Sequence, residues 1–438
     1  MSELDVLGLD RDVKRIAESW GRWRRGLRQG GGIDWDPFAL GPDVARRTTW
    51  HAVAELDPAD PLRRPLERWI YRLAEQRINR QGLARIAWLR CHAPHRLNGP
   101  EPGTYTAHDL TQRLLTDSPR REAWLEALEQ AGDELSRSEG LVWERRQEIA
   151  NGMGLDSPDD VEGVAGADAA ARRWLEVSAE LLDDTSITSW EQWMSLAMGE
   201  AAGEGWPARL TPRTMTEMLS ETSWLDRVPL DPGELPAALG AASFVRALAQ
   251  IGCAWGEALA TSRQPFVIAH DPYGLRSAEF GALFASLPLH PAFTRRVLAV
   301  GAPRVRDHLR AMARVWLLGT RIAALRVLLR QAALAGTRAL RDAYPELVRT
   351  ACGLGLSSRL AAVVVRLDVD DTARFAGLLQ GALRRERQVQ EHDEDWFRDP
   401  RSAEALRDEA DLPPPVDVPG QALDQGIDAL GRLLRSIW

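Results

Sequence analysis

The sequence predicts an all-α protein, and two observations support this class. Apolar residues recur at spacings of three and four along most of the chain, which places them on one stripe of a helix. Strand patterns are rare, and the best candidate is Phe266–Ala269, which lies between Pro265 and a turn that begins at Asp271. We therefore expect roughly fifteen helices with at most one or two short strands.

Several helices can be placed from these patterns. The first carries a stripe that includes Val13, Ile16, Trp20 and Trp23, and Gly30–Gly32 should end it. Residues 42–93 predict two helices, the second long, and 303–334 predict the longest helix of the chain. Trp396 and Phe397 follow an acidic stretch at 391–395 and are expected to anchor it to the body.

The composition is close to that of an average globular protein. The chain has 438 residues, of which 45% are hydrophobic and 27% are charged, and these values disfavour disorder. Stretches rich in proline and glycine suggest four parts. These are an N-terminal helical region (1–105), a middle helical region (106–232), a C-terminal helical region (233–410), and a proline linker with an amphipathic terminal helix (411–438).

Charge and cysteine content restrict the environment. The net charge of −8 disfavours nucleic acid as a partner. No uncharged apolar run reaches the ~18 residues that a membrane span requires, and no signal peptide is recognisable at the N-terminus. Three widely spaced cysteines fit a reducing compartment, so we expect a cytoplasmic protein.

Catalytic sequence motifs are missing. The chain has no GxSxG, no Walker GK[ST], no CxxC and no HExxH, so no catalytic residue and no cofactor is assigned. His270, Glu279 and His308 lie in one stretch, and their side chains suit zinc, manganese or iron if they converge. The alternative is that each has an ordinary role in a turn or in the first turns of a helix.

Residues 235–335 resemble part of a known enzyme family. A helix (GAASFVRALAQIGCAW), a connector (QPFVIAHDPYGL), a helix that starts SAEFGALF and a long helix rich in arginine and leucine follow one another. This order is similar to the helical zinc oligopeptidases of the thimet oligopeptidase and oligoendopeptidase type. In that family HExxH provides two zinc ligands and the general base, and a glutamate on the next helix provides the third ligand.

The resemblance implies that the classical zinc site is lost. Ser243, Phe244 and Ala247 stand where the HExxH residues would be, and none of them can bind zinc or accept the proton. Glu279 would match the third ligand, although its separation from Ser243 is longer than is usual in the family. The resemblance thus implies a pseudo-peptidase on a degenerate helical scaffold.

We predict that the chain is a noncatalytic binding or assembly protein on this scaffold. A peptide ligand is compatible with this function. One alternative is a metal-dependent hydrolase or peptidase with an atypical site around Glu279. A second alternative is a helical adaptor or cargo protein that its C-terminal helix recruits to a larger assembly.

The terminal helix has two interpretations. A proline linker precedes one apolar stripe, which is typical of a peptide that docks on a partner protein. The helix can equally fold back on the core of its own chain. The expected partner-binding residues are Leu423, Ile427, Leu430, Leu434, Ile437 and Trp438.

Overall fold

The computed structural model describes residues 4–28, 35–97, 103–116, 120–185, 192, 241–260, 264–415 and 417–438. Within these ranges the chain forms eighteen α-helices and one two-stranded sheet. The all-α prediction is therefore confirmed. The predicted turn at 30–32 and the predicted boundary at 232–233 fall outside the described residues.

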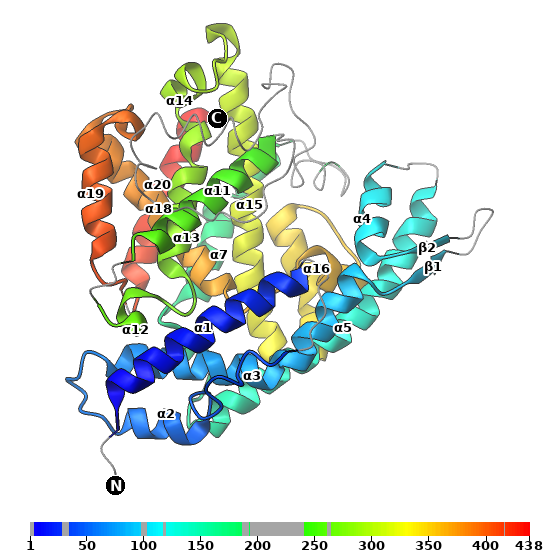
Figure 1. The fold of residues 1–438 in the computed structure, drawn as a ribbon. Helices are drawn as coiled ribbons and strands as arrows, with labels where there is room; N and C mark the ends of the chain where they lie inside the picture. The colour runs from blue at the N-terminus through cyan, green and yellow to red at the C-terminus, as the bar shows by residue number, and fades with distance from the viewer. Residues whose placement is uncertain are drawn as a thin grey trace.

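Long N-terminal helices form one layer of the molecule (Figure 1). Helix α3 (Arg63–Cys91) packs against α1 (Val6–Arg28), α2 (Arg47–Ala54) and α5 (Arg121–Gly152). The apolar stripe predicted for the first helix is buried, as Val13, Ile16, Trp20 and Trp23 show. Helix α5 has 32 residues and exceeds the 30 of α15 (Val305–Leu334), so the longest described helix is not the one that the sequence predicted.

A helical bundle packs on this layer (Figure 1). Helix α15 contacts α7 (Ala167–Val177), α16 (Thr337–Cys352) and α18 (Asp371–His392). Helix α13 (Leu275–Ala285) lies between α11 (Ala241–Ala258) and α18. The other α-helices are α4 (Ala107–Thr116), α6 (Asp159–Glu162), α8 (Ala179–Asp183), α12 (Phe266–Ala269), α14 (Pro291–Arg296), α17 (Ala361–Val364), α19 (Pro400–Asp411) and α20 (Gly420–Ile437). The 3-10 helices are η2 (Leu287–Leu289), η3 (Ala302–Arg304), η4 (Ser358–Leu360) and η5 (Trp396–Arg398).

Two short strands lie beside α5. Strands β1 (His95–Leu97) and β2 (Gly103–Tyr105) pair in antiparallel fashion, with His95 opposite Tyr105. The sequence pattern predicted only the end of a helical region in this stretch. One or two short strands are nevertheless compatible with the predicted all-α class. Both strands lie before the predicted boundary between 105 and 106, whereas α3 and α5 pack along each other across it.

The predicted strand Phe266–Ala269 is wrong, because these residues form the helical turn α12. The first N–H groups of a helix lack acceptors within the helix. Here the Asp10 carboxylate of α1 accepts hydrogen bonds from the N–H groups of Phe266 (3.1 Å) and Val267 (2.9 Å). A side chain distant in the sequence therefore stabilises the turn, and local spacing cannot reveal it.

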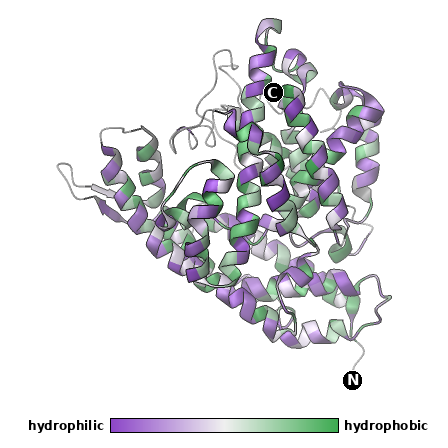
Figure 2. Ribbon diagram, turned by 180° about the vertical axis from the view of Figure 1, so that it is seen from behind, coloured by the Kyte–Doolittle hydropathy of each residue, from purple (hydrophilic) through white to green (hydrophobic). Residues whose placement is uncertain are grey.

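Hydrophobic residues gather where the helices meet, whereas hydrophilic residues dominate the outward sides of the long N-terminal helices (Figure 2). One buried cluster is built by α1, α2 and α3, and a larger one fills the bundle. Trp396 and Phe397 are buried in the larger cluster, which confirms that they anchor the stretch after α18. None of the described helices is long and apolar enough to cross a bilayer.

The C-terminal helix α20 packs on its own chain, against α18, α7 and α15. Leu423, Ile427, Leu430 and Leu434 are fully buried there, while Ile437 and Trp438 are half-buried. Arg310 donates hydrogen bonds of 3.2 and 3.0 Å to the Trp438 carbonyl oxygen. The face that was expected to bind a partner is therefore covered within the chain, and its packing does not support the partner-binding prediction.

We predict that Leu430→Ala lowers the free energy of unfolding by about 2–5 kcal/mol, because it opens a cavity in the core. Leu412 is 62% exposed, and Leu412→Ala should change the same quantity by less than about 0.5 kcal/mol. Urea denaturation followed by circular dichroism measures both. Equal, small effects would mean that α20 is only loosely attached.

Candidate functional site

The carboxylate of Glu279 is held by an ion pair. Arg384 of α18 donates from Nε to Glu279 Oε1 at 2.7 Å, and the same guanidinium pairs with Glu409 of α19. The guanidinium also lies 4.8 Å from the centre of the Phe280 ring. Glu279 therefore links α13 with α18, and its carboxylate is already engaged.

The other two metal candidates occupy separate surroundings. His270 Nδ1 is 3.4 Å from Glu257 Oε2, and the His270 carbonyl oxygen accepts a hydrogen bond from Trp69 Nε1. His308 is buried near the start of α15. Across the described ranges no group of three histidine, cysteine or acidic residues could hold a metal ion, so His270, Glu279 and His308 do not form one.

Buried ion pairs join the N-terminal layer to the bundle. Arg146 of α5 pairs with Glu75 of α3 and, at 2.8 Å, with Glu162 of α6. Arg330 of α15 binds the same Glu162 oxygen at 2.6 Å. Arg72 of α3 pairs with Asp370, which directly precedes α18. The side chains of Arg72, Glu75, Arg146, Glu162 and Arg330 are at most 2% exposed, and we call these five residues and Asp370 the ion network.

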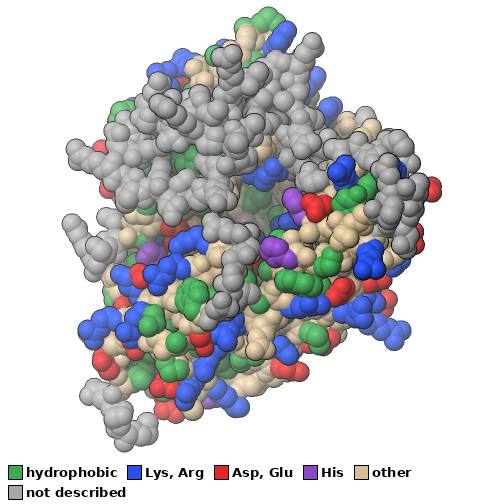
Figure 3. All heavy atoms as spheres, turned by 45° about the vertical axis from the view of Figure 1, so that its right-hand side comes forward, with side chains coloured by type: hydrophobic (Ala, Val, Ile, Leu, Met, Phe, Trp, Pro, Cys, Tyr) green, Lys and Arg blue, Asp and Glu red, His purple; other side chains and the backbone are tan. Residues whose placement is uncertain are grey.

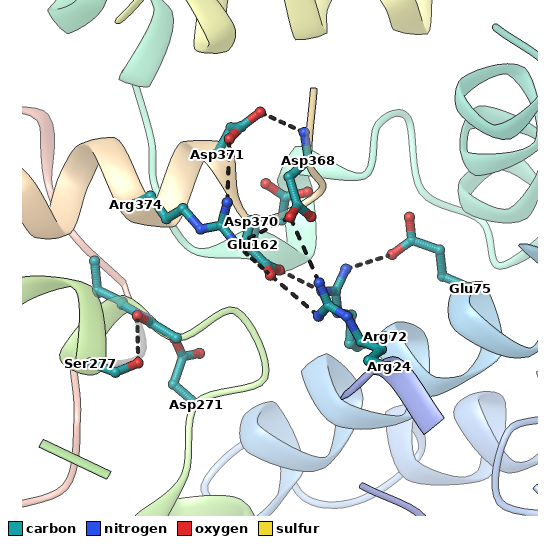
Figure 4. A network of polar contacts seen from close by, with 12 residues as sticks. Arg24, Arg72, Glu75, Glu162, Asp271, Ser277, Asp368, Asp370, Asp371 and Arg374 are labelled. Carbon is teal, nitrogen blue, oxygen red and sulfur yellow. Dashed lines mark hydrogen bonds and ion pairs between the residues drawn. The ribbon is translucent and has the colours of Figure 1, made fainter. Parts of the chain in front are cut away.

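Further charges surround the ion network (Figure 4). Arg68 pairs with Asp271 at 2.9 Å and donates to the backbone carbonyl oxygens of Val161 and Glu162. Asp368 accepts a hydrogen bond from Arg374 at 3.1 Å and lies 3.7 Å from Arg24. The charges of α3, α6, α15 and α18 therefore meet in one place.

The pKa values follow from this packing. Burial by itself would raise the pKa of Asp368, but Arg374, Arg24 and Arg72 together hold it well below its usual value. Burial would likewise lower the pKa of Arg146, yet Glu75 and Glu162 raise it. Both groups are therefore charged at neutral pH, as an ion pair requires.

A cavity of about 210 Å³ adjoins the ion network. Helices α1, α3 and α5 and the loop between α17 and α18 enclose it. Trp20 and Trp23 line one side as a stacked pair, with ring centres 4.5 Å apart and ring planes inclined by 22°. Its charged lining residues are Arg24, Arg72, Arg90, Glu75, Glu139 and Asp368, so that positive and negative charges balance.

Several residues that line this cavity carry buried polar atoms with no hydrogen-bond partner among the described residues. An unsatisfied buried polar group costs about 1–3 kcal/mol, so such atoms cluster where a ligand or water completes the bonding. They are Trp20 Nε1, Trp23 Nε1, Arg72 Nε, Asn79 Nδ2, Asn79 Oδ1, Arg90 Nε and Glu139 Oε2. Asn79 contributes both a donor and an acceptor although it is only 2% exposed.

Glu139 is the titratable group of the cavity near neutral pH. Burial raises its pKa from 4.5 to about 7, although Arg90 and Arg366 oppose the shift. Arg90 pairs with one Glu139 oxygen, while Glu139 Oε2 is among the atoms without a partner. The cavity therefore holds a carboxyl group that changes its charge close to physiological pH.

The sequence contains a pattern of polar residues that indicates this site, although the spacing of apolar residues does not reveal it. Four buried polar residues share one face of α3, because they follow one another at spacings of four, three and four. They are Arg68, Arg72, Glu75 and Asn79. A polar stripe on a helix that also carries buried apolar residues indicates an internal polar site. The partners on α5, α6, α15 and α18 could not be identified from the sequence, because nothing local pairs them with α3.

Comparison with protein-family models, with curated proteins and with solved structures finds no match.

We predict that Arg146→Met lowers the free energy of unfolding by about 3–5 kcal/mol, because Glu75 and Glu162 then lose a buried partner. The exposed pair of Arg432 with Glu386 provides the control, and Arg432→Met should cost less than about 1 kcal/mol. Urea denaturation of both variants measures the difference. Similar costs would show that the ion network adds no more than a surface pair.

The raised pKa of Glu139 predicts a pH-dependent effect of Glu139→Gln. The contribution of this carboxyl to stability is fully present below pH 4.5, where both states are protonated. Between pH 4.5 and about 7 the unfolded chain releases the proton that the folded protein keeps, so the free energy of unfolding falls with rising pH. This contribution is lost as the pH rises through the folded-state pKa. The stability of the variant relative to wild type should thus increase by about 1–2 kcal/mol from pH 5.5 to pH 8.

Urea denaturation at the two pH values tests this effect, with Glu134→Gln on the same helix as the control for the substitution. A relative stability of Glu139→Gln that does not change with pH would contradict the assignment.

Proposed function

We propose that this protein is a noncatalytic binding protein that holds a small, planar, uncharged polar molecule in the cavity between α1, α3 and α5. The observation that carries the proposal is the side chain of Asn79, which lines the cavity with an unpaired amide donor and an unpaired acceptor. A molecule that presents the complementary acceptor and donor side by side would satisfy both.

The size and lining of the cavity define the ligand class. At about 30 Å³ per molecule, 210 Å³ corresponds to roughly seven waters, which suits a single small ring system. The indoles of Trp20 and Trp23 offer flat apolar surfaces with N–H donors at their edges. Three arginines and three acids among the described residues line the cavity, and one of these acids, Glu139, changes its charge near neutral pH. An uncharged molecule therefore fits better than an ion of high charge.

A nucleobase has these properties. Asparagine recognises adenine through paired hydrogen bonds to its N6 and N7 atoms, and bases stack on aromatic side chains at a gain of about 1–3 kcal/mol. Free adenine is therefore the probe that we choose. The proposed ligand is the base alone, without a sugar, a phosphate or a nucleic acid.

The other predicted functions find weaker support. A hydrolase around Glu279 would require a carboxylate that Arg384 already binds. Recruitment through the C-terminal helix would require an apolar face that is buried against α18 and α7. A degenerate zinc oligopeptidase scaffold stays a prediction from the order of the helices in the sequence, and it is compatible with noncatalytic binding. The three cysteines form no disulfide, which supports the proposed cytoplasmic location.

We predict that isothermal titration calorimetry detects adenine binding to the wild-type protein, and that Asn79→Leu weakens it by about tenfold to a hundredfold. Leucine has a similar size but provides neither hydrogen bond, each of which is worth about 1 kcal/mol or more. Asn151 is an exposed asparagine on α5, and Asn151→Leu should bind adenine as the wild type does.

A thermal melt of each variant checks that it is folded. The proposal is wrong if the wild type shows no heat of binding, or if Asn79→Leu binds adenine as tightly as wild type.

A further inference from the structure

A second hollow differs from the cavity in size, lining and charge. It is a cleft of about 650 Å³ that α4, α11, α13, α15, α17 and α18 line. Its walls are mostly small or apolar, and they include Val245, Ala249, Ala278, Val315, Ile322 and Leu378. The volume is within the range of about 300–1,000 Å³ that is usual for ligand pockets. A hollow bordered by basic and histidine side chains is visible on this side of the molecule (Figure 3).

The cleft has a strongly one-sided charge. Four arginines line it, Arg246, Arg326, Arg366 and Arg374, and none of its described lining residues is acidic. This is unusual in a chain with 63 acidic and 55 basic residues. Arg374 pairs with Asp368 behind the wall, and Arg326 donates to the Val365 carbonyl oxygen at 2.7 Å.

Arg366 is the arginine that is placed to bind a ligand. Its side chain has no ion pair and no hydrogen bond to any described residue, and it is exposed at the wall of the cleft. Partial desolvation of the guanidinium and the neighbouring charges of Arg90 and Arg326 lower the pKa of Arg366. A cation in this position gains more from an incoming anion than one that is already paired.

The backbone at Arg366 is strained. Its φ is 51°, which is in the left-handed region that a residue with a long side chain rarely adopts. Such strain costs on the order of 1–3 kcal/mol and collects at ligand sites. The loop between α17 and α18 therefore holds Arg366 at the cleft in a strained conformation.

We propose that this cleft binds an anionic amphiphile, a molecule with one carboxylate and an unbranched apolar chain. The apolar walls remove the chain from water, and Arg366 forms the planar pair of hydrogen bonds that a guanidinium makes with a carboxylate. The cleft is a different site from the cavity that Asn79 lines, and the proposal does not depend on adenine binding.

Decanoate is the probe for this site, and isothermal titration calorimetry with the full chain is the measurement. The wild type should bind decanoate at least tenfold more tightly than decanol, which lacks the charge, and more tightly than butyrate, which lacks the chain. Decanol that binds as tightly as decanoate, or a wild type that binds neither, would overturn the proposal.

Two variants separate loss of binding from loss of folding. Arg366→Gly removes the charge and tolerates the positive φ, so its melting temperature should equal or exceed that of the wild type while its affinity for decanoate falls at least tenfold. Gly319 lines the cleft, and a Cβ placed there meets no atom of the described residues within 4 Å. Gly319→Leu should therefore fill the cleft, keep the fold and abolish binding.

Arg338→Gly is the control, because its side chain is 96% exposed on α16, and it should leave decanoate binding unchanged. If Arg366→Gly and Gly319→Leu are folded and bind decanoate as the wild type does, the cleft is not the site.

Discussion

The arrangement of this protein depends on the buried ion network that links Arg72, Glu75, Arg146, Glu162 and Arg330 with Asp370. A buried charge without a partner costs several kcal/mol, so each of these groups restricts where the next can lie. Because the charges come from α3, α5, α6, α15 and the start of α18, these elements must meet in one relative position. Apolar packing alone would tolerate small shifts, whereas paired charges do not.

The loop between α17 and α18 connects the ion network to both hollows. Asp370 binds Arg72, while Leu367, Asp368 and Val369 line the cavity and Arg366 lines the cleft. One short segment therefore forms a wall of two sites with different chemistry. The cavity has balanced charges and unpaired hydrogen-bonding groups, and the cleft has apolar walls with excess positive charge. This contrast is the reason to assign a neutral planar ligand to the cavity and an anionic amphiphile to the cleft.

A binding role agrees with how the charged groups are used. Glu279, the residue that any metal-dependent chemistry was expected to need, forms an ion pair with Arg384 between α13 and α18. Buried acids and arginines elsewhere are similarly committed to each other. Asn79 in the cavity and Arg366 in the cleft are among the described groups that retain unused hydrogen-bonding capacity or charge. In the described part of the chain no group of three histidine, cysteine or acidic residues could hold a metal ion.

The sequence by itself determined the helical class, the stripe of Val13, Ile16, Trp20 and Trp23, and the anchoring of Trp396, because these depend on spacing along one segment. Only the tertiary structure decided that Phe266–Ala269 forms a helical turn, because the carboxylate that accepts hydrogen bonds from its first N–H groups belongs to Asp10 of α1. It also decided that α20 packs in its own chain and that Arg72 meets Asp370. These outcomes depend on partners outside the local segment, and local periodicity carries no information about which distant side chain will satisfy a buried charge or cover an apolar face.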